Sequence, residues 1–177
     1  MRRTLGASGT TFELVKAPGG FAGDYSLGLL GRHQALNAGY AIAVAAEFGL
    51  SPAQVRQGLA ECAPPKSRLK LTECAGISLL DDSYNANADS MIAAVKTLAE
   101  LLCSGKRVAV IGDMAELGAH TEAAHREVGA QVAALNIDLL VAVGTQASAT
   151  VAGAQGAAAA RWRPRARSIL PSWNAAP

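Results

Sequence analysis

The arrangement of apolar and polar residues changes once along the chain, near the pair Pro64-Pro65. Before this pair, two short β-rich runs at residues 11–17 and 25–31 flank a Pro-Gly-Gly turn and predict two paired strands. The stretch 33–49 predicts a helix, and because it is apolar almost all round we expect it to be buried. Ser51-Pro52 then starts a second helix, with serine as N-cap and proline at N1, that runs to about residue 61.

Beyond the proline pair, apolar runs alternate with amphipathic stretches. Helices are expected at about 89–103 and 121–135, with a further helix after the last strand. The expected strands lie at residues 70–73, 77–82, 107–112 and 138–143. Strands and helices that alternate at this spacing imply βαβ crossovers and a parallel sheet. The predicted fold class is therefore α/β, with a Rossmann-like parallel sheet in the carboxy-terminal domain.

The same pattern divides the chain into three parts. Residues 1–64 have too few strands for an independent sheet domain and are interpreted as the end of a domain. Residues 65–155 form the predicted Rossmann-like domain. The tail, 156–177, lacks periodicity, and the favoured interpretation is an irregular, disordered end. A basic patch for an anionic partner is the alternative.

Charge and cysteine content narrow the class of protein. The last 17 residues hold four arginines and no acid, so the other 160 residues carry 12 basic and 14 acidic side chains. A nearly neutral body gives no reason to expect nucleic-acid binding. The three cysteines are widely spaced and form no CxxC pair, which suits reduced thiols in the cytoplasm. We see neither a secretory signal nor an apolar run of about 18 residues, and expect a cytoplasmic protein without membrane insertion.

Two polar segments directly follow predicted strands, where ligands of parallel sheets bind. They are DDSYNANADS (81–90) and GDMAELG (112–118), both dense in carboxylates and amides. Asn and Asp also cap helices at such turns, so for any single residue a capping role is about as plausible as a ligand role. Two consecutive acids with a tyrosine and two asparagines in one turn are more than capping requires.

These segments resemble signatures of the Mur ligase family. DDSYNANADS is similar to DDSYNANPDS, and GDMAELG to GDMLELG, both from the branch that adds D-alanyl-D-alanine. His125 and Gly129 match an HxxxG that follows. GRHQALNAGYA resembles the GxHNxxNAxAA that opens a long helix of the family's central domain, and PKSRLKL resembles the KGRxE stretch that begins its carboxy-terminal domain. These motifs, in the order that the family has them, identify a member of the family.

The resemblance implies a fold and a reaction. The family has an amino-terminal domain for a UDP-sugar, a central ATPase domain and a Rossmann-like carboxy-terminal domain. Its members use ATP and Mg²⁺ to activate a carboxylate as an acyl phosphate, which an incoming amine attacks to give an amide, ADP and phosphate. The implied substrates are UDP-muramoyl-tripeptide and D-alanyl-D-alanine, for peptidoglycan synthesis.

The resemblance also implies site residues. A guanidinium at position 68 suits contact with the nucleotide phosphates, and the aspartate at 82 matches one placed at the ribose. The full set expected near the nucleotide is His33, Asn37, Arg68, Asp82, Tyr84 and Asn87. The set expected near D-alanyl-D-alanine is Asn85, Asp89, Ser90, Asp113 and Glu116. No certain catalytic residue and no metal ligand is assigned.

Several features depart from the family pattern. Gln34 replaces an asparagine, Ala88 replaces a proline, and Ser67 replaces a glycine, which matters only if that position needs a positive φ. The sequence contains no GxxxxGK[ST] phosphate-binding loop, which in the family lies upstream together with the magnesium ligands. The tail lacks the family's usual VKGSR-like segment, so we expect a truncated or frameshifted reading frame.

The leading hypothesis is thus the carboxy-terminal part of a ligase, inactive when made alone. Another amide-forming member of the family, such as a murein-peptide or folylpolyglutamate ligase, is the closest rival, and the DDSYNAN segment argues against it. A non-catalytic module that binds a nucleotide or the dipeptide is the alternative from a different class. Nucleic-acid binding through the tail is a third, which the acidic body disfavours.

Overall fold

The computed structural model describes residues 3–6, 9–157 and 167–169 of the 177-residue chain. It divides into two compact units. The first comprises the chain up to Tyr84 together with residues 100–102, and the second comprises residues 85–99 and the chain from Cys103 onward. Each unit has a hydrophobic core of its own.

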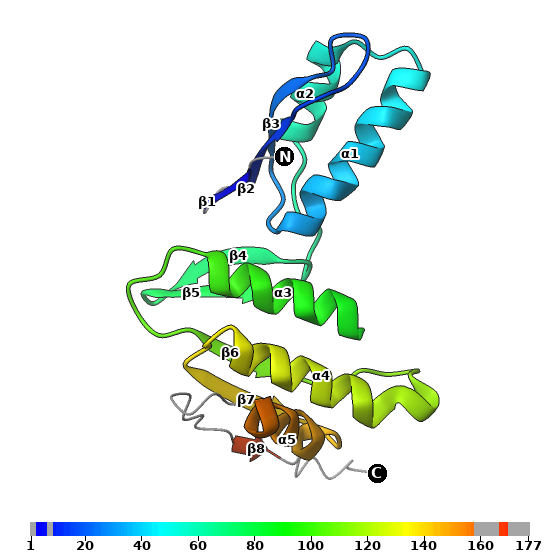
Figure 1. Ribbon diagram of the computed structural model, residues 1–177. Coiled ribbons are helices and arrows are strands. Elements are labelled where there is room, and N and C mark those ends of the chain that lie inside the picture. Colours follow the sequence, from blue (N-terminus) through cyan, green and yellow to red (C-terminus); the bar gives the residue numbers. More distant parts are fainter. Residues whose placement is uncertain (1–2, 7–8, 158–166, 170–177) are drawn as a thin grey trace, which may run out of the picture. The chain divides into compact units, whose positions relative to one another are not determined.

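In the first unit, an antiparallel sheet packs against two helices (Figure 1). Its elements are β1 (Arg3–Gly6), β2 (Gly9–Leu14), β3 (Gly23–Leu27), α1 (Arg32–Glu47) and α2 (Pro52–Ala60). The strands pair in the order β1-β2-β3. The rings of Phe12 and Tyr25 stack in the core with centroids 5.4 Å apart. The expected strand pair is therefore confirmed as β2 and β3, and β1 is an additional strand that the pattern does not predict.

Helix α1 buries only one of its faces. Its last residue is Glu47, and Gly49, two residues later, has a φ of 77°, which is typical of a glycine that terminates a helix. Its buried side chains are Ala35, Ala38 and Ile42. The prediction that the whole helix is buried is wrong, because a helix that packs on one sheet covers one face only. The opposite face carries an apolar stripe at four-residue spacing, each member more than half exposed: Leu36, Tyr40, Val44 and Phe48.

The predicted start of α2 is confirmed in detail. Ser51 is the N-cap and Pro52 is the first helical residue. The backbone N–H of Gln54 donates to Ser51 Oγ at 3.3 Å, and the backbone N–H of Ser51 donates to Gln54 Oε1 at 2.9 Å. This reciprocal capping satisfies backbone donors that the helix itself cannot satisfy.

The segment after the proline pair forms a hairpin. β4 (Lys70–Cys74) pairs antiparallel with β5 (Ile77–Asp81), with Cys74 opposite Ile77. The two connecting residues, Ala75 and Gly76, have φ of 48° and 76°, the backbone of a tight two-residue turn. The expectation that residues 77–82 form a strand is confirmed for residues 77–81, but the neighbour that the structure shows is β4, to which β5 is antiparallel. A place for this strand in the parallel sheet stays a prediction. The two-residue connection constrains β5 to run antiparallel to its neighbour, because a parallel partner needs a long crossover.

The second unit contains the predicted parallel sheet. Strands β6, β7 and β8 are parallel and pair in that order, which confirms the α/β fold class. β8 lies within the tail that we expected to be irregular, so that expectation is corrected for its three residues; the tail's other arginine-rich residues, 158–166, lie outside the described residues. The elements are α3 (Ala88–Glu100), β6 (Val108–Ile111), η1 (Gly118–His120), α4 (Thr121–Ala134), β7 (Leu139–Val143), α5 (Ala147–Ala157) and β8 (Arg167–Ile169).

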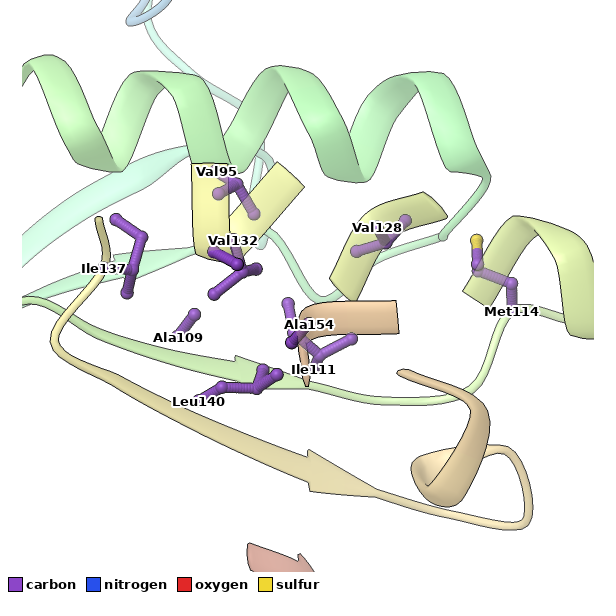
Figure 2. Close-up of a cluster of buried hydrophobic side chains, with 10 residues drawn as sticks. Val95, Ala109, Ile111, Met114, Val128, Val132, Ile137, Leu140 and Ala154 are labelled. Atoms are coloured by element: carbon purple, nitrogen blue, oxygen red, sulfur yellow. The ribbon is translucent and has the colours of Figure 1, made fainter. Parts of the chain in front are cut away.

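The core of this unit lies between the inner face of the sheet and its helices. Figure 2 shows Leu140 of β7 facing side chains from α3, α4 and α5. Alternation in β6 buries Ala109 and Ile111 and leaves Val108 and Val110 exposed. One face of this strand is thus covered by helices, and the other faces away from them.

Helices α4 and α5 approach each other unusually closely at two glycines. A Cβ at Gly129 of α4 would lie 1.9 Å from the carbonyl oxygen of Thr150. A Cβ at Gly153 of α5 would lie 1.9 Å from the carbonyl oxygen of Arg126. The absence of side chains at these two positions therefore sets the distance between the helices. In the part of the chain that the structure describes, no helix has the length and apolarity to cross a membrane.

We predict that Gly129→Ala destabilises the protein, because its methyl group would collide with backbone and could be accommodated only by moving α5. Overpacking of this kind costs about 1–3 kcal/mol. Gly156→Ala is the matched control, since a Cβ added there would meet nothing within 4 Å and alanine favours helix by up to about 1 kcal/mol. Urea unfolding of both variants measures the difference. Equal midpoints would contradict the close approach.

Candidate functional site

Arg68 lies in a tight turn whose two flanking residues have left-handed backbone. Ser67 has φ of 56° and Leu69 has φ of 46°, a conformation that costs non-glycine residues roughly 1–2 kcal/mol each. The family's glycine before the arginine therefore has a physical reason, and the serine here departs from it at a position that does need a positive φ. The buried side chain of Leu69 anchors the far side of the turn.

The segment Asp81–Tyr84 holds this turn in place. Ser67 Oγ donates to Asp81 Oδ2 at 2.9 Å, and the backbone N–H of Leu69 donates to Asp82 Oδ1 at 3.0 Å. The backbone N–H of Tyr84 donates to the Ser67 carbonyl at 3.1 Å. Both adjacent carboxylates are thus engaged with the turn that bears Arg68, and these contacts compensate for its disfavoured backbone.

The two aspartates have opposite electrostatic environments. The hydroxyl and backbone N–H of Ser83, with the Ser67 hydroxyl, hold the pKa of the Asp81 carboxyl below its usual range. Burial raises the pKa of Asp82, and the Leu69 N–H and the charges of His33 and Arg68 only partly offset this. For His33, whose charged form is a cation, burial lowers the pKa, and the negative charge of Asp82 opposes this shift. Asp82 and His33 therefore influence each other, as two members of one site would.

Arg68 and Tyr84 are in direct contact. The guanidinium carbon lies 4.2 Å from the centroid of the Tyr84 ring, within the range of a cation–π interaction, and both side chains are exposed. Near the start of α1, Asn37 Nδ2 donates to Gln34 Oε1 at 3.2 Å. The substituted glutamine therefore contacts the asparagine expected near adenine.

At the start of α3, capping accounts for two residues of the expected site. The backbone N–H of Ser90 donates to Asn87 Oδ1 at 2.8 Å, and the backbone N–H of Asn87 donates to Ser90 Oγ at 3.1 Å. Asn85 Oδ1 accepts the N–H of Ala86 at 2.9 Å, and exposed Asp89 lies in the first helical turn. For Asn87 and Ser90 the capping interpretation thus has direct support, and their ligand roles stay predictions.

Asp113 joins the end of β6 to the loop after β7. Its Oδ2 accepts the backbone N–H of Thr145 at 2.7 Å and the Thr145 hydroxyl at 2.9 Å, and its Oδ1 accepts the N–H of Gln146 at 3.0 Å. Gly144, with φ of 115°, makes room, because a Cβ there would lie 2.4 Å from the Asp113 carboxyl carbon. The carboxylate expected near the dipeptide is therefore engaged by backbone donors at the start of α5.

His125 fixes the same loop from the other side. Its ring is fully buried, and Nε2 accepts the backbone N–H of Met114 at 3.0 Å. The proton must then be on Nδ1, which lies 2.6 Å from the Thr121 carbonyl oxygen and donates to it. The HxxxG spacing thus has a structural explanation: the histidine holds the GDMAELG loop, and Gly129 one turn later admits α5.

The expected site residues fall in both units. His33, Asn37, Arg68, Asp82 and Tyr84 belong to the first unit. The second unit contains Asn85, Asn87, Asp89, Ser90, Asp113 and Glu116, the last of which is exposed and has φ of 62°. Because both polar segments follow predicted parallel strands, the sequence predicts that Asp82, Asn85, Asn87, Asp113 and Glu116 share one rim of the sheet, and this stays a prediction. The pattern missed Thr145 and Gln146, whose only sequence signal is their place after a strand and a glycine.

We predict that Ser67→Ala is about 1 kcal/mol less stable than Ser67→Gly. Alanine loses the hydrogen bond to Asp81 and keeps the left-handed backbone, whereas glycine loses the same bond and relieves the backbone. Thermal unfolding of the two variants and the parent chain measures this order. Two variants of equal stability would show that the positive φ costs nothing at this position.

We also predict that Asp113 makes the protein acid-sensitive. Burial alone would raise the pKa of this carboxyl, but the hydrogen bonds from Gln146 and Thr145 outweigh it and lower the pKa. When folding lowers the pKa of a carboxyl, the carboxylate contributes its full stabilisation of the folded state above the unfolded-state pKa of about 3.9. This contribution is lost as the pH falls through the lower pKa of the folded state. Melting temperatures between pH 7 and pH 3 should fall less for Asp113→Asn than for the control Glu127→Gln. Parallel profiles would contradict the role of Asp113.

Comparisons with known proteins agree with the motifs. A family model described as Mur ligase, glutamate ligase domain, matches residues 67–176. UDP-N-acetylmuramoyl-tripeptide--D-alanyl-D-alanine ligase of Escherichia coli K12 is 44% identical over 142 residues, which are 80% of this chain and 30% of that protein. The chain thus matches less than a third of this relative's length.

Solved structures give the same result. A crystal structure of MurF from Acinetobacter baumannii has a TM-score of 0.84 at 32% identity and covers 96% of this chain and 35% of that one. MurF ligase from Thermotoga maritima, solved in complex with ADP, shares the fold with a TM-score of 0.66 at 20% identity, over 96% of this chain and 36% of that one. With a family model over more than half of its length, the chain belongs to the Mur ligase family.

Proposed function

We propose that this chain forms the carboxy-terminal part of an ATP-dependent ligase that joins D-alanyl-D-alanine to UDP-N-acetylmuramoyl-tripeptide for the bacterial cell wall. The observation that carries the proposal is the 44% identity to the Escherichia coli ligase of that name, together with the DDSYNANADS segment. In the proposed reaction the tripeptide carboxylate becomes an acyl phosphate, and the dipeptide amine displaces phosphate to form an amide. ATP supplies the phosphoryl group.

The turn around Arg68 is the part of the chain best suited to the nucleotide. Its guanidinium is exposed, and its two neighbours are held by aspartates, Ser67 through its hydroxyl and Leu69 through its backbone N–H. A positive charge fixed in this way stabilises negative charge on a phosphate without first having to reorganise. His33 and Asn37, at the start of α1 in the same unit, are proposed to contribute the contacts to the base.

Magnesium does not fit the described residues. Across residues 3–6, 9–157 and 167–169, no group of three or more His, Cys, Asp or Glu side chains could hold a metal ion. The carboxylates of Asp81, Asp82 and Asp113 are engaged by hydrogen-bond donors of the protein itself. We therefore assign the Mg²⁺ of the reaction to another part of the ligase and derive no step from it.

The same proposal extends to domain organisation and location. The family model begins at residue 67, directly after the proline pair, which supports a domain boundary near 64–65. Residues 1–64 would then be the end of the central ATPase domain. A ligase that uses ATP and a UDP-sugar works where these nucleotides are made, so we propose the cytoplasm. The partners of this chain would be small-molecule substrates.

We predict that the purified chain alone releases no phosphate steadily from ATP with Mg²⁺, UDP-muramoyl-tripeptide and D-alanyl-D-alanine. Positioning and charge stabilisation around the phosphates account for most of such catalysis, and the sequence has no phosphate-binding loop. The few exposed contacts that it offers should bind ATP no more tightly than about 1 mM, or roughly −4 kcal/mol.

Adding the upstream two-thirds of the Escherichia coli ligase should produce phosphate release that depends on the dipeptide. In this mixture Arg68→Ala should abolish release, and Arg126→Ala, on the exposed surface of α4, should not. Steady turnover by the chain alone, lost in Asp82→Ala, would show that its catalytic machinery is complete. Dipeptide binding without turnover in any mixture would instead favour a non-catalytic module.

A further inference from the structure

Arg68 has an unusual set of neighbours for an exposed arginine. It makes no ion pair with a carboxylate anywhere in the part of the chain that the structure describes, although Asp82 is close enough for the charge of Arg68 to influence it. Its guanidinium instead lies over the Tyr84 ring, 4.2 Å from the centroid. An aromatic partner holds the cation without neutralising it.

A guanidinium stacked on a ring keeps its hydrogen-bond donors available. A guanidinium is planar and its five N–H groups lie in that plane, pointing outward from its edge. A ring that faces the plane occupies one face of the group and none of its donors. Two parallel N–H groups can then bind two oxygens of one phosphate, the bidentate arrangement that arginine favours.

The backbone supports the same arrangement. The Tyr84 N–H donates to the Ser67 carbonyl, so the residue that carries the ring is bonded to the residue before Arg68. On the other side of Arg68, the Leu69 N–H donates to Asp82, and the Arg68 N–H itself donates to the Pro65 carbonyl at 3.3 Å. Main-chain hydrogen bonds therefore hold the two residues side by side, which brings the ring within reach of the guanidinium.

We propose that Tyr84 is a positioning residue for Arg68, which holds the guanidinium face so that its N–H edge can bind a phosphate chain. This rests on the proposed function, and it gives Tyr84 a different role from direct contact with the nucleotide. Tyr84 acts through Arg68, and the ligand class is a di- or triphosphate. Because the contact uses the ring and not the hydroxyl, phenylalanine can replace tyrosine and leucine cannot.

The test uses the 177-residue chain and the NMR signal of the Arg68 Nε–Hε group. In the parent chain and in Tyr84→Phe, the ring current should shift this signal from its free position, and the heteronuclear NOE should report an ordered side chain. Tyr84→Leu should return both to values of a free arginine without changing the melting temperature. The matched control is Tyr40→Leu, another tyrosine about two-thirds exposed, on α1.

The second readout is titration with inorganic triphosphate. Tyr84→Leu should raise the dissociation constant for triphosphate by about two- to five-fold, the range for an exposed cation–π contact. Tyr84→Phe and Tyr40→Leu should leave it unchanged. An Arg68 signal that is the same in the parent chain and Tyr84→Leu would overturn the positioning role. An ordered, ring-shifted Arg68 that binds no triphosphate would support positioning and count against the proposed ligase site.

Discussion

Backbone N–H groups in the turns at strand ends have no carbonyl of a neighbouring strand to bond to, and in this chain aspartate carboxylates accept their hydrogen bonds. Asp82 accepts the N–H of Leu69, and Asp113 accepts those of Thr145 and Gln146. An unpaired backbone donor is costly wherever water cannot reach it, and a carboxylate is the strongest acceptor available. The shape of both motif segments follows from this constraint. Residues that resemble ligands thus also determine the loops from which any ligand would be contacted.

Local chemistry made much of the fold predictable. The capped start of α2, the glycine end of α1 and the parallel pairing of β6 with β7 each follow from short-range signals: a serine before a proline, a glycine after an apolar stretch, and strands separated by a helix. The antiparallel pairing of β5 with β4 was not predicted, because an apolar run does not specify its partner. The signal that does specify it, a two-residue connection through Gly76, was present in the sequence.

The candidate site was less predictable for a different reason. The sequence identifies which side chains gather in a segment, but the same carboxylates and amides serve as caps and as ligands. Asn87 and Ser90 cap α3, and Asp113 holds a loop, which only the three-dimensional structure could establish. The stacking of Arg68 on Tyr84 joins residues 16 positions apart and has no periodic signature. The positive φ of Ser67 was indicated by the family's glycine and by nothing in this chain alone.

The apolar stripe of α1 has a consequence for the amount of this polypeptide in a cell. Four large side chains in line along this helix and its end, each more than half exposed, form the kind of apolar surface that chaperones bind and that quality-control proteases recognise. The steady-state amount of such a chain is set by a competition among burial of the stripe, self-association and degradation. A surface remote in sequence from Arg68 can therefore affect how much of this polypeptide persists in the cell.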